Sequence, residues 1–201
     1  MAVHNNMTIS AKSARAQRRR EYLTADEVER LLAASKTASR NPERDYTILL
    51  LAYRHGLRVS ELCSLKLSDV NLEVGEFHVS RLKGSDSGSH PFYNGESAAI
   101  RAWLVERAKL NPPADVDTLF ISERRKPLSR VTVWLMIGQV AQAAGLGHLE
   151  IHPHMLRHSC GYALVNKGTD IRVIQGYLGH RSISSTVRYT KLDRKRFAKL
   201  F

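Results

Sequence analysis

The sequence predicts one domain that is mainly α-helical and carries a small antiparallel β-hairpin, an α+β fold. Three observations lead to this prediction. Most of the chain has apolar residues at helical spacing, bounded by capping residues, glycines and prolines. One short stretch near residue 80 alternates between apolar and polar residues, as strands do. The length of 201 residues, 43% of them apolar, suffices for one sizeable core.

The first predicted helices have clear start and stop signals. Thr24 and Glu27 form a capping box ahead of apolar residues at helical spacing, so a helix begins at this point. A second helix begins at Pro42, whose fixed backbone suits a first helical turn, and ends near Gly56. Ser60 is expected to cap a short third helix.

Strands are expected only in the middle of the chain. Residues 77–82 and 90–93 form the predicted hairpin, and the glycine- and serine-rich residues 84–88 form its turn. A further short strand is expected over residues 119–121. The remaining apolar segments predict helices over residues 96–110, 129–145, 153–168, 170–178, 183–190 and 194–201.

Residues 1–20 differ in composition from the rest, so we expect a flexible basic arm ahead of a folded domain over residues 21–201. The arm has few bulky apolar groups and lacks acidic residues; its basic residues are Lys12, Arg15, Arg18, Arg19 and Arg20. Its composition leaves three interpretations open, namely contact with a DNA backbone, a solvated tail and a transit peptide.

The charge of the chain indicates an acidic partner. Lys and Arg number 31 against 19 Asp and Glu, which gives a formal charge of +12. Cations that neutralise phosphates release counterions, so nucleic acid is the favoured partner. A membrane surface is less favoured, because the basic residues are not gathered on one amphipathic helix. No apolar run reaches the roughly 20 residues needed to span a bilayer.

Cysteine use and the lack of one motif exclude further classes. Cys63 and Cys160 both lie in apolar helical patterns, so we expect two buried free thiols in a reducing cytoplasm rather than a disulfide. The sequence contains no glycine-rich loop of the kind that cradles nucleotide phosphates, and nothing in it indicates ATP use.

Residue types suited to phosphate chemistry lie at the ends of predicted elements: Arg58, Lys83, His154, Arg157, His180 and Tyr189. Arg58 follows the stop at Gly56, and Lys83 lies at the predicted hairpin turn. His154 and Arg157 are three residues apart on a predicted helix, so they share one face and can converge on one anion.

Four segments around these residues resemble, in the same order, the motifs of the tyrosine recombinases, the phage integrase family. They are GLRVSEL at residues 56–62, HMLRH at 154–158, LGH at 178–180 and VRYT at 187–190. Three further strings resemble the small fimbrial phase-switch invertases within that family: AYRHG at 52–56, HPHMLRH at 152–158 and YLGHR at 177–181.

The resemblance implies a tyrosine recombinase catalytic fold and a site built on Tyr189. Tyr189 would attack a DNA phosphate, leaving a 3′-phosphotyrosyl bond and a free 5′ hydroxyl. Arg58 and Arg157 would spread the phosphate charge over planar, permanently charged donors, and His180 would donate to the same phosphate.

Two proton transfers also follow from the resemblance. His154 would assist removal of the phenolic proton, and Lys83 would protonate the leaving 5′ oxygen. Glu61, one turn after Arg58, would orient the site or serve as a salt-bridge partner. The family needs neither a metal nor ATP, because the phosphotyrosyl bond conserves the energy of the broken bond.

The resemblance also implies partners. They are double-stranded DNA with short inverted repeats, a homotetramer on that DNA, and accessory DNA-bending proteins, all at the nucleoid in a bacterial cytoplasm. Residues 193–201 would be a tail exchanged between subunits or packed on their own domain. The 201 residues leave no room for the separate core-binding domain of most tyrosine recombinases.

Three other functions are weighed against this reading. His152, His154 and His158 suggest a zinc site, but Pro153 leaves His152 outside the helix and no carboxylate or thiolate completes the set, so His158 is expected to be a buried, hydrogen-bonded helix residue. A type IB topoisomerase-like enzyme would use the same chemistry to relax DNA without sequence choice. A non-cleaving DNA-binding regulator would need only the basic charge.

Overall fold

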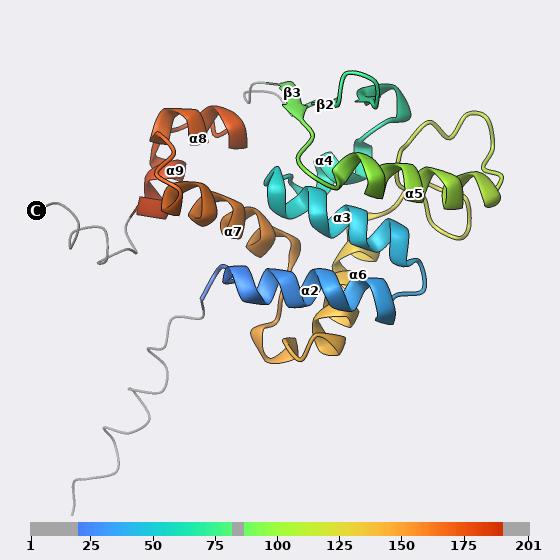
Figure 1. The fold of residues 1–201 in the computed structure, drawn as a ribbon, viewed down its shortest axis with the longest axis horizontal. Coiled ribbons are helices and arrows are strands. Elements are labelled where there is room, and N and C mark those ends of the chain that lie inside the picture. The colour runs from blue at the N-terminus through green and yellow to red at the C-terminus, as the bar shows by residue number, and fades with distance from the viewer. Residues whose placement is uncertain (1–19, 82–86, 191–201) are drawn as a thin grey trace, which may run out of the picture.

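The computed structural model describes residues 20–81 and 87–190 and has the mainly helical architecture predicted from the sequence (Figure 1). The longer helices are α2 (Ala25–Ala38), α3 (Pro42–Arg54), α5 (Glu96–Lys109), α6 (Arg130–Ala143) and α7 (Pro153–Asn166). The shorter α-helices are α4 (Val59–Ser64), α8 (Ile171–Leu178) and α9 (Ser184–Val187). The 3₁₀ turns in the described part of the chain are η2 (Leu67–Asp69), η3 (Gly147–Leu149) and η4 (Arg188–Thr190).

The predicted hairpin is part of a three-stranded antiparallel sheet. Its strands are β1 (Val70–Asn71), β2 (Glu76–Val79) and β3 (Gly88–Pro91), in the spatial order β1-β2-β3. Phe77 pairs with Val70 on one side and with His90 on the other. The predicted turn lies mostly in residues 82–86, outside the described residues.

Two hydrophobic clusters hold the described residues together. The larger joins α2, α3, α5, α6 and the first turn of α7, and the smaller contains Cys160, Val165, Ile174, Leu178 and Tyr189. Figure 1 shows α8 and α9 gathered at the end of the molecule opposite the outer end of α5. The second half of α7 therefore carries the small cluster, and its first half packs against the large one.

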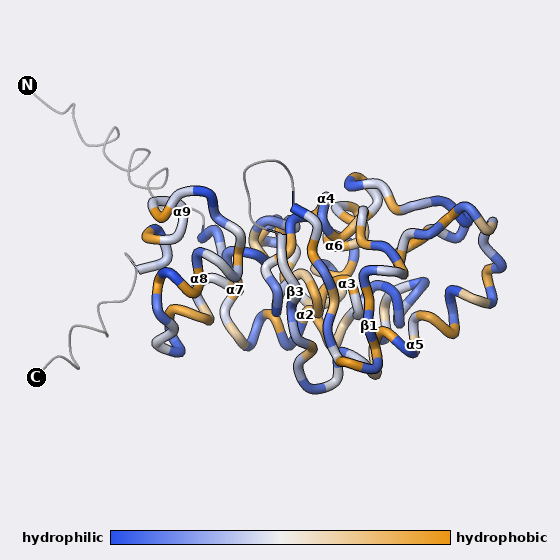
Figure 2. The backbone as a smooth tube through the Cα atoms, turned by 90° about the horizontal axis from the view of Figure 1, so that it is seen from above, coloured by the Kyte–Doolittle hydropathy of each residue, from blue (hydrophilic) through white to orange (hydrophobic). Residues whose placement is uncertain are grey.

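Polar and apolar residues alternate along the helices (Figure 2), as expected for elements that bury one face. Among the described residues no helix is both long and apolar enough to cross a bilayer. Both cysteines are free; Cys160 is buried as predicted, but Cys63, on the short helix α4, is only partly buried and packs at the edge of the large cluster.

Helix starts follow the predicted signals with one exception. In the capping box of α2, the Thr24 hydroxyl accepts from the Glu27 amide at 3.3 Å, and the Glu27 carboxylate accepts from the Thr24 amide at 2.8 Å. Pro42 and Pro153 occupy first-turn positions. The prediction that Ser60 caps the third helix is wrong: Arg58 precedes α4, and its amide donates to Glu61 at 2.8 Å.

The strand predicted over residues 119–121 is also absent from the described structure, although all three residues are buried. Isolated bridges lie at its two ends, Lys66 with Thr118 and Ile121 with Pro127. Side chains of α5 take the place of a neighbouring strand: the indole nitrogen of Trp103 donates to Leu119 O at 2.9 Å, and Arg107 donates to Thr118 O. The carbonyls are thus satisfied without a sheet.

Candidate active site

Arg58 is positioned by the start of α4 and by the turn after α8. Its Nη1 donates to Glu61 Oε1 at 2.6 Å, and its Nη2 donates to the Gly179 carbonyl at 3.3 Å. The side chain remains 31% exposed, whereas that of Glu61 is buried. Glu61 therefore orients the guanidinium of Arg58 and leaves part of it open to an anion from solvent.

Arg157 is 1% exposed and lies on the inward face of α7. Its Nη1 donates to Gly56 O at 2.5 Å and its Nη2 donates to Leu178 O at 2.6 Å. Burial, followed by the nearby Arg58, lowers the pKa of Arg157 to about 10, so it still carries its charge at neutral pH. Gly56 has φ +58°, and a Cβ there would lie 2.3 Å from a methyl carbon of Leu178, so this turn requires glycine.

The turn at residues 178–180 brings three of the predicted residues together. Arg58 binds its Gly179 carbonyl, Arg157 binds its Leu178 carbonyl, and His180 belongs to it. The Nδ1 of His180 hydrogen-bonds with the Thr186 hydroxyl at 2.9 Å. Burial, then Arg157, lowers the pKa of His180 to about 4, so this ring is neutral at neutral pH.

Tyr189 lies in η4 and is only 2% exposed. Its ring is stacked with that of His180, with 6.0 Å between centroids and 23° between planes. The ring also packs on α7 at Gly161, where an added Cβ would approach it to 2.6 Å. Burial raises the pKa of Tyr189, while Arg157 and Arg188 oppose that rise.

The Tyr189 hydroxyl has a histidine partner, which is His158 rather than His154. The distance from its oxygen to Nδ1 of His158 is 3.1 Å. His158 is buried and hydrogen-bonded on α7, as predicted, but the partner found for it was not foreseen. His154 is exposed, and its ring meets that of His158 edge-on at 4.5 Å between centroids. Burial, then His154, lowers the pKa of His158 to about 3.

Lys83 lies outside the described residues, so the structure leaves its predicted role untested. The zinc reading gains no support: within the described part of the chain, no three histidine, cysteine or acidic side chains are grouped as a metal site requires. A groove of about 660 Å³ opens beside Arg58; its other lining residues are Val59, Ser60, Arg130, Val131, Trp134, His152, Pro153 and His154.

Three residues of this site carried no usable signal in the sequence. His158 stood out only as part of a histidine string. It lies 31 residues before Tyr189, and that separation does not reveal the hydrogen bond between the two side chains. Gly161 is one of two glycines near the middle of predicted helices, and only the ring packed on it distinguishes it. Arg81 resembled any basic residue of a hairpin.

A mainly helical domain in which two arginines and a histidine meet at one turn, beside a buried tyrosine ring, matches the class of proteins that exchange DNA strands through a tyrosine. The comparison with known families agrees, since the model of the phage integrase family matches residues 21–196. The chain belongs to this family.

Relatives and solved structures share most of the chain. The type 1 fimbriae regulatory protein FimB of Escherichia coli strain K12 is 44% identical over 180 residues, covering 90% of this chain and 88% of FimB. FimE of the same strain is 43% identical over 183 residues, covering 91% of each.

Among solved structures, the XerA recombinase has a TM-score of 0.76 and 34% identity, covering 88% of this chain and 62% of that one. The XerH site-specific recombinase bound to difH substrate in a pre-cleavage complex also has a TM-score of 0.76. It is 25% identical over 90% of this chain and 54% of its own. The chain thus spans between half and two thirds of these larger recombinases.

Proposed function

We propose that this protein is a site-specific DNA recombinase that cleaves and rejoins duplex DNA through a covalent bond to Tyr189. The observation that carries the proposal is the turn at residues 178–180. Arg58 and Arg157 bind its carbonyls, His180 is part of it, and the Tyr189 ring is stacked on His180. Fixed cationic donors beside a nucleophilic oxygen are what an unreactive phosphodiester requires.

In the proposed step the Tyr189 oxygen attacks phosphorus, and the bond from phosphorus to the 5′ oxygen breaks. Arg58 and Arg157 hold the nonbridging oxygens, and His180 donates to the same phosphate. His158 is neutral and accepts the phenolic proton through the hydrogen bond that it makes with the hydroxyl. Its other ring nitrogen then gives up a proton, and we assign the uptake of that proton to the neighbouring, solvent-exposed His154. Since Tyr189 is 2% exposed, η4 must shift before the hydroxyl reaches a duplex.

Lys83 is proposed to give its proton to the leaving 5′ oxygen, which is the second of the two proton transfers in the cleavage step. The product is a 3′-phosphotyrosyl bond with a free 5′ hydroxyl, and a partner hydroxyl reverses the same reaction. Because the covalent bond keeps the energy of the broken one, the reaction requires neither a nucleotide nor a metal. Adduct formation is therefore expected to proceed in a chelator without ATP.

The relatives guide the proposal for biological role. FimB and FimE are regulatory proteins of type 1 fimbriae and cover nearly the whole described domain. We propose that this protein inverts a promoter-bearing segment between short inverted repeats and so switches fimbrial expression. It would work as a homotetramer with DNA-bending partners at the bacterial nucleoid in the cytoplasm. Residues 193–201, outside the described residues, would be exchanged between subunits.

The test uses nicked suicide duplexes that carry inverted repeats from fimbrial promoter regions. The wild-type protein should leave an adduct that survives denaturation, and sequencing the joined DNA identifies the site. Tyr189→Phe should bind the same DNA and form no adduct. An adduct that persists in the Phe variant contradicts the nucleophile assignment.

Two other outcomes favour the other functions. Relaxation of a supercoiled plasmid that lacks repeats would indicate a topoisomerase-like enzyme. Tight, sequence-specific binding with no adduct on any duplex would indicate a DNA-binding regulator that does not cleave. Strand exchange between two repeats supports the recombinase.

A further inference from the structure

Arg81 is a buried arginine that follows β2 and has no part in the reaction described above. Its side chain is 1% exposed. It donates to the carbonyl of Leu178, and through Nη2 to the carbonyl of Tyr177 at 2.8 Å. A buried cation is costly unless its donors are matched. These carbonyls at the end of α8 are therefore a built binding site for the guanidinium of Arg81.

Two of the acceptors around Arg81, the Leu178 carbonyl and the Glu61 carboxylate, also hold Arg157 and Arg58. The Leu178 carbonyl also accepts from Arg157 at 2.6 Å. Glu61 Oε1, which accepts from Arg58 at 2.6 Å, lies 3.7 Å from Nη1 of Arg81. Arg81 thus lies between Arg58 and Arg157 in one chain of shared acceptors.

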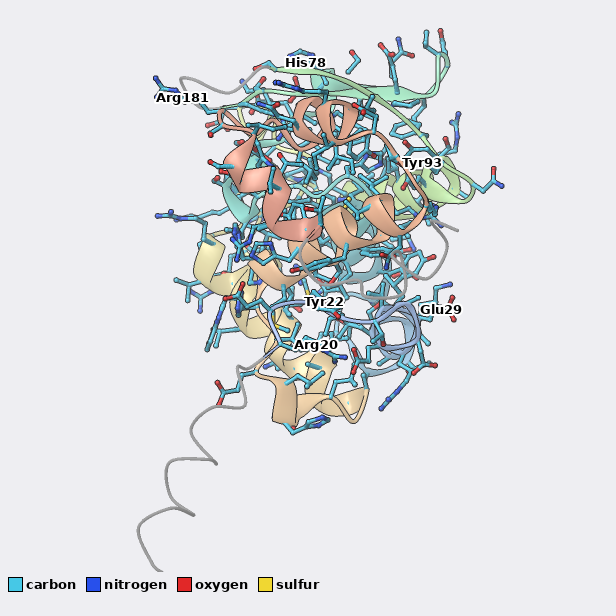
Figure 3. The ribbon with its side chains drawn as sticks, turned by 90° about the vertical axis from the view of Figure 1, so that its left-hand side faces the viewer. Arg20, Tyr22, Glu29, His78, Tyr93 and Arg181 are labelled. Atoms are coloured by element: carbon cyan, nitrogen blue, oxygen red, sulfur yellow. The ribbon has the colours of Figure 1, made fainter. Side chains whose placement is uncertain are left out.

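The turn that leads into His180 is shaped around the same side chain. Gly179 has φ +61°, and a Cβ there would lie 2.5 to 2.6 Å from three atoms of Arg81. In Figure 3, His78 on β2 and Arg181 just after the turn are labelled at the same end of the molecule. The sheet and the turn therefore meet at Arg81.

A series of buried hydrogen bonds runs from Arg81 through two histidines to a glutamate. Its Nη2 lies 3.3 Å from Nε2 of His90, and Nδ1 of His90 lies 3.3 Å from Nδ1 of His55. Nε2 of His55 is 3.0 Å from Glu96 Oε2. Because arginine can only donate, each ring accepts on the side facing Arg81 and donates on the other, and the series ends on a carboxylate. This direction fixes one tautomer for each ring.

We propose that Arg81 is a positioning residue for DNA cleavage: it fixes the Glu61 carboxylate and the Leu178 carbonyl, and through them the guanidinium groups of Arg58 and Arg157. Arg81 does not touch the phosphate itself. The inference rests on the proposed function, since it gives Arg81 a role in the chemistry assigned there.

The test compares Arg81→Met with Arg107→Met. Arg107 is a matched control, because it is also buried and donates to backbone carbonyls, those of Val116 and Thr118, but belongs to α5 and to no part of the site. Single-turnover adduct formation is measured at saturating nicked duplex, which separates the cleavage rate from DNA affinity. Thermal unfolding of both variants shows how much of each loss is structural.

Arg81→Met is expected to lower the saturating rate on the order of 10²-fold, the loss typical of a catalytic group misplaced by about an ångström. Its DNA affinity should stay within a few-fold of the wild type. Arg107→Met should lower the unfolding temperature and keep the saturating rate within about twofold. If Arg81→Met does not fold, Arg81→Lys carries the test, because it keeps the charge but cannot reach both carbonyls and Glu61 together.

A second substrate distinguishes positioning from a general structural effect. A methylphosphonate at the cleaved position carries no negative charge and so depends less on the two guanidinium groups. The defect of Arg81→Met should shrink on this substrate, as that of Arg58→Ala should. A rate equal to the wild type on the ordinary duplex, or an equal defect on both substrates, would overturn the proposal. A wild-type protein that forms no adduct at all would instead remove the proposed function, and the role of Arg81 with it.

Discussion

Gly161 shows how one missing side chain determines where the nucleophile lies. An added Cβ at this position would approach the Tyr189 ring to 2.6 Å, inside α7 where glycine has no other advantage. Gly161→Ala is therefore expected to displace the ring and to lower the free energy of unfolding by about 1 to 3 kcal/mol, a typical cost of overpacking. Adduct formation should fall as well, because the displaced hydroxyl loses His158. Urea unfolding and the suicide-substrate assay measure the two effects.

Gly138→Ala is the control for this substitution. Gly138 also lies inside a long helix, α6, but a Cβ there would meet nothing within 4 Å. Alanine at such a position should stabilise the helix by up to about 1 kcal/mol and leave adduct formation unchanged. Equal stability of the two variants would show that the ring does not depend on Gly161.

Buried histidines at the junctions between elements should make the stability of the fold dependent on pH. Burial is the main cause that lowers the pKa of His90 on β3 and of His158 on α7, each to about 3, against about 6.5 in the unfolded chain. Between these values the unfolded state binds more protons, so stability is fully present above about pH 6.5 and is lost as the pH falls. Each ring contributes up to about 1.4 kcal/mol per pH unit.

Urea unfolding from pH 4.5 to 7.5 measures this dependence. The free energy of unfolding should rise with pH up to about 6.5 and then level off for these two groups. His90→Phe should give a shallower rise, because one of the two rings is gone. His148→Phe changes an exposed residue of η3 and should leave the slope as it is. An unchanged slope in His90→Phe would contradict the prediction.

Elements with local signals could be predicted, and those that depend on distant partners could not. Caps and first-turn prolines are written within a few residues, so the starts of α2, α3, α6 and α7 were foreseen. The buried run at residues 119–121 has the composition of a strand, but Trp103 and Arg107 bind the neighbouring carbonyls instead. The third strand, β1, spans two residues and leaves no readable pattern.

The same distinction holds for the site. Arg58, Arg157, His180 and Tyr189 lie in strings that resemble a known family, and the fold brings these four around one turn and one ring. The contacts of Tyr189 with Gly161 and His158, and the acceptors that Arg58 and Arg157 share with Arg81, join segments far apart in sequence. Spacing along the chain does not encode such contacts, so only the folded structure could supply them.

At the scale of the whole molecule, a chain of 201 residues carries a large positive charge. The formal charge is +12, and several cations of the described domain are already paired, such as Arg20 with Glu27 at 2.5 Å and Arg188 with Glu21 at 2.5 Å. Arg20 was counted with the basic arm in the sequence, but its pairing with α2 attaches it to the folded domain. Four basic residues then remain for the arm: Lys12, Arg15, Arg18 and Arg19.

If the arm contacts the DNA backbone, its removal should change how binding depends on salt. Each phosphate contact contributes about 0.9 to the slope of log affinity against log salt concentration, so a chain that begins at Arg20 should lose up to about four from that slope. Fluorescence anisotropy with a labelled duplex from 50 to 300 mM KCl measures it. A full-length variant with the four basic residues changed to Gln should match the truncation, because charge rather than length causes the loss. An unchanged slope in both proteins would show that the arm is a solvated tail.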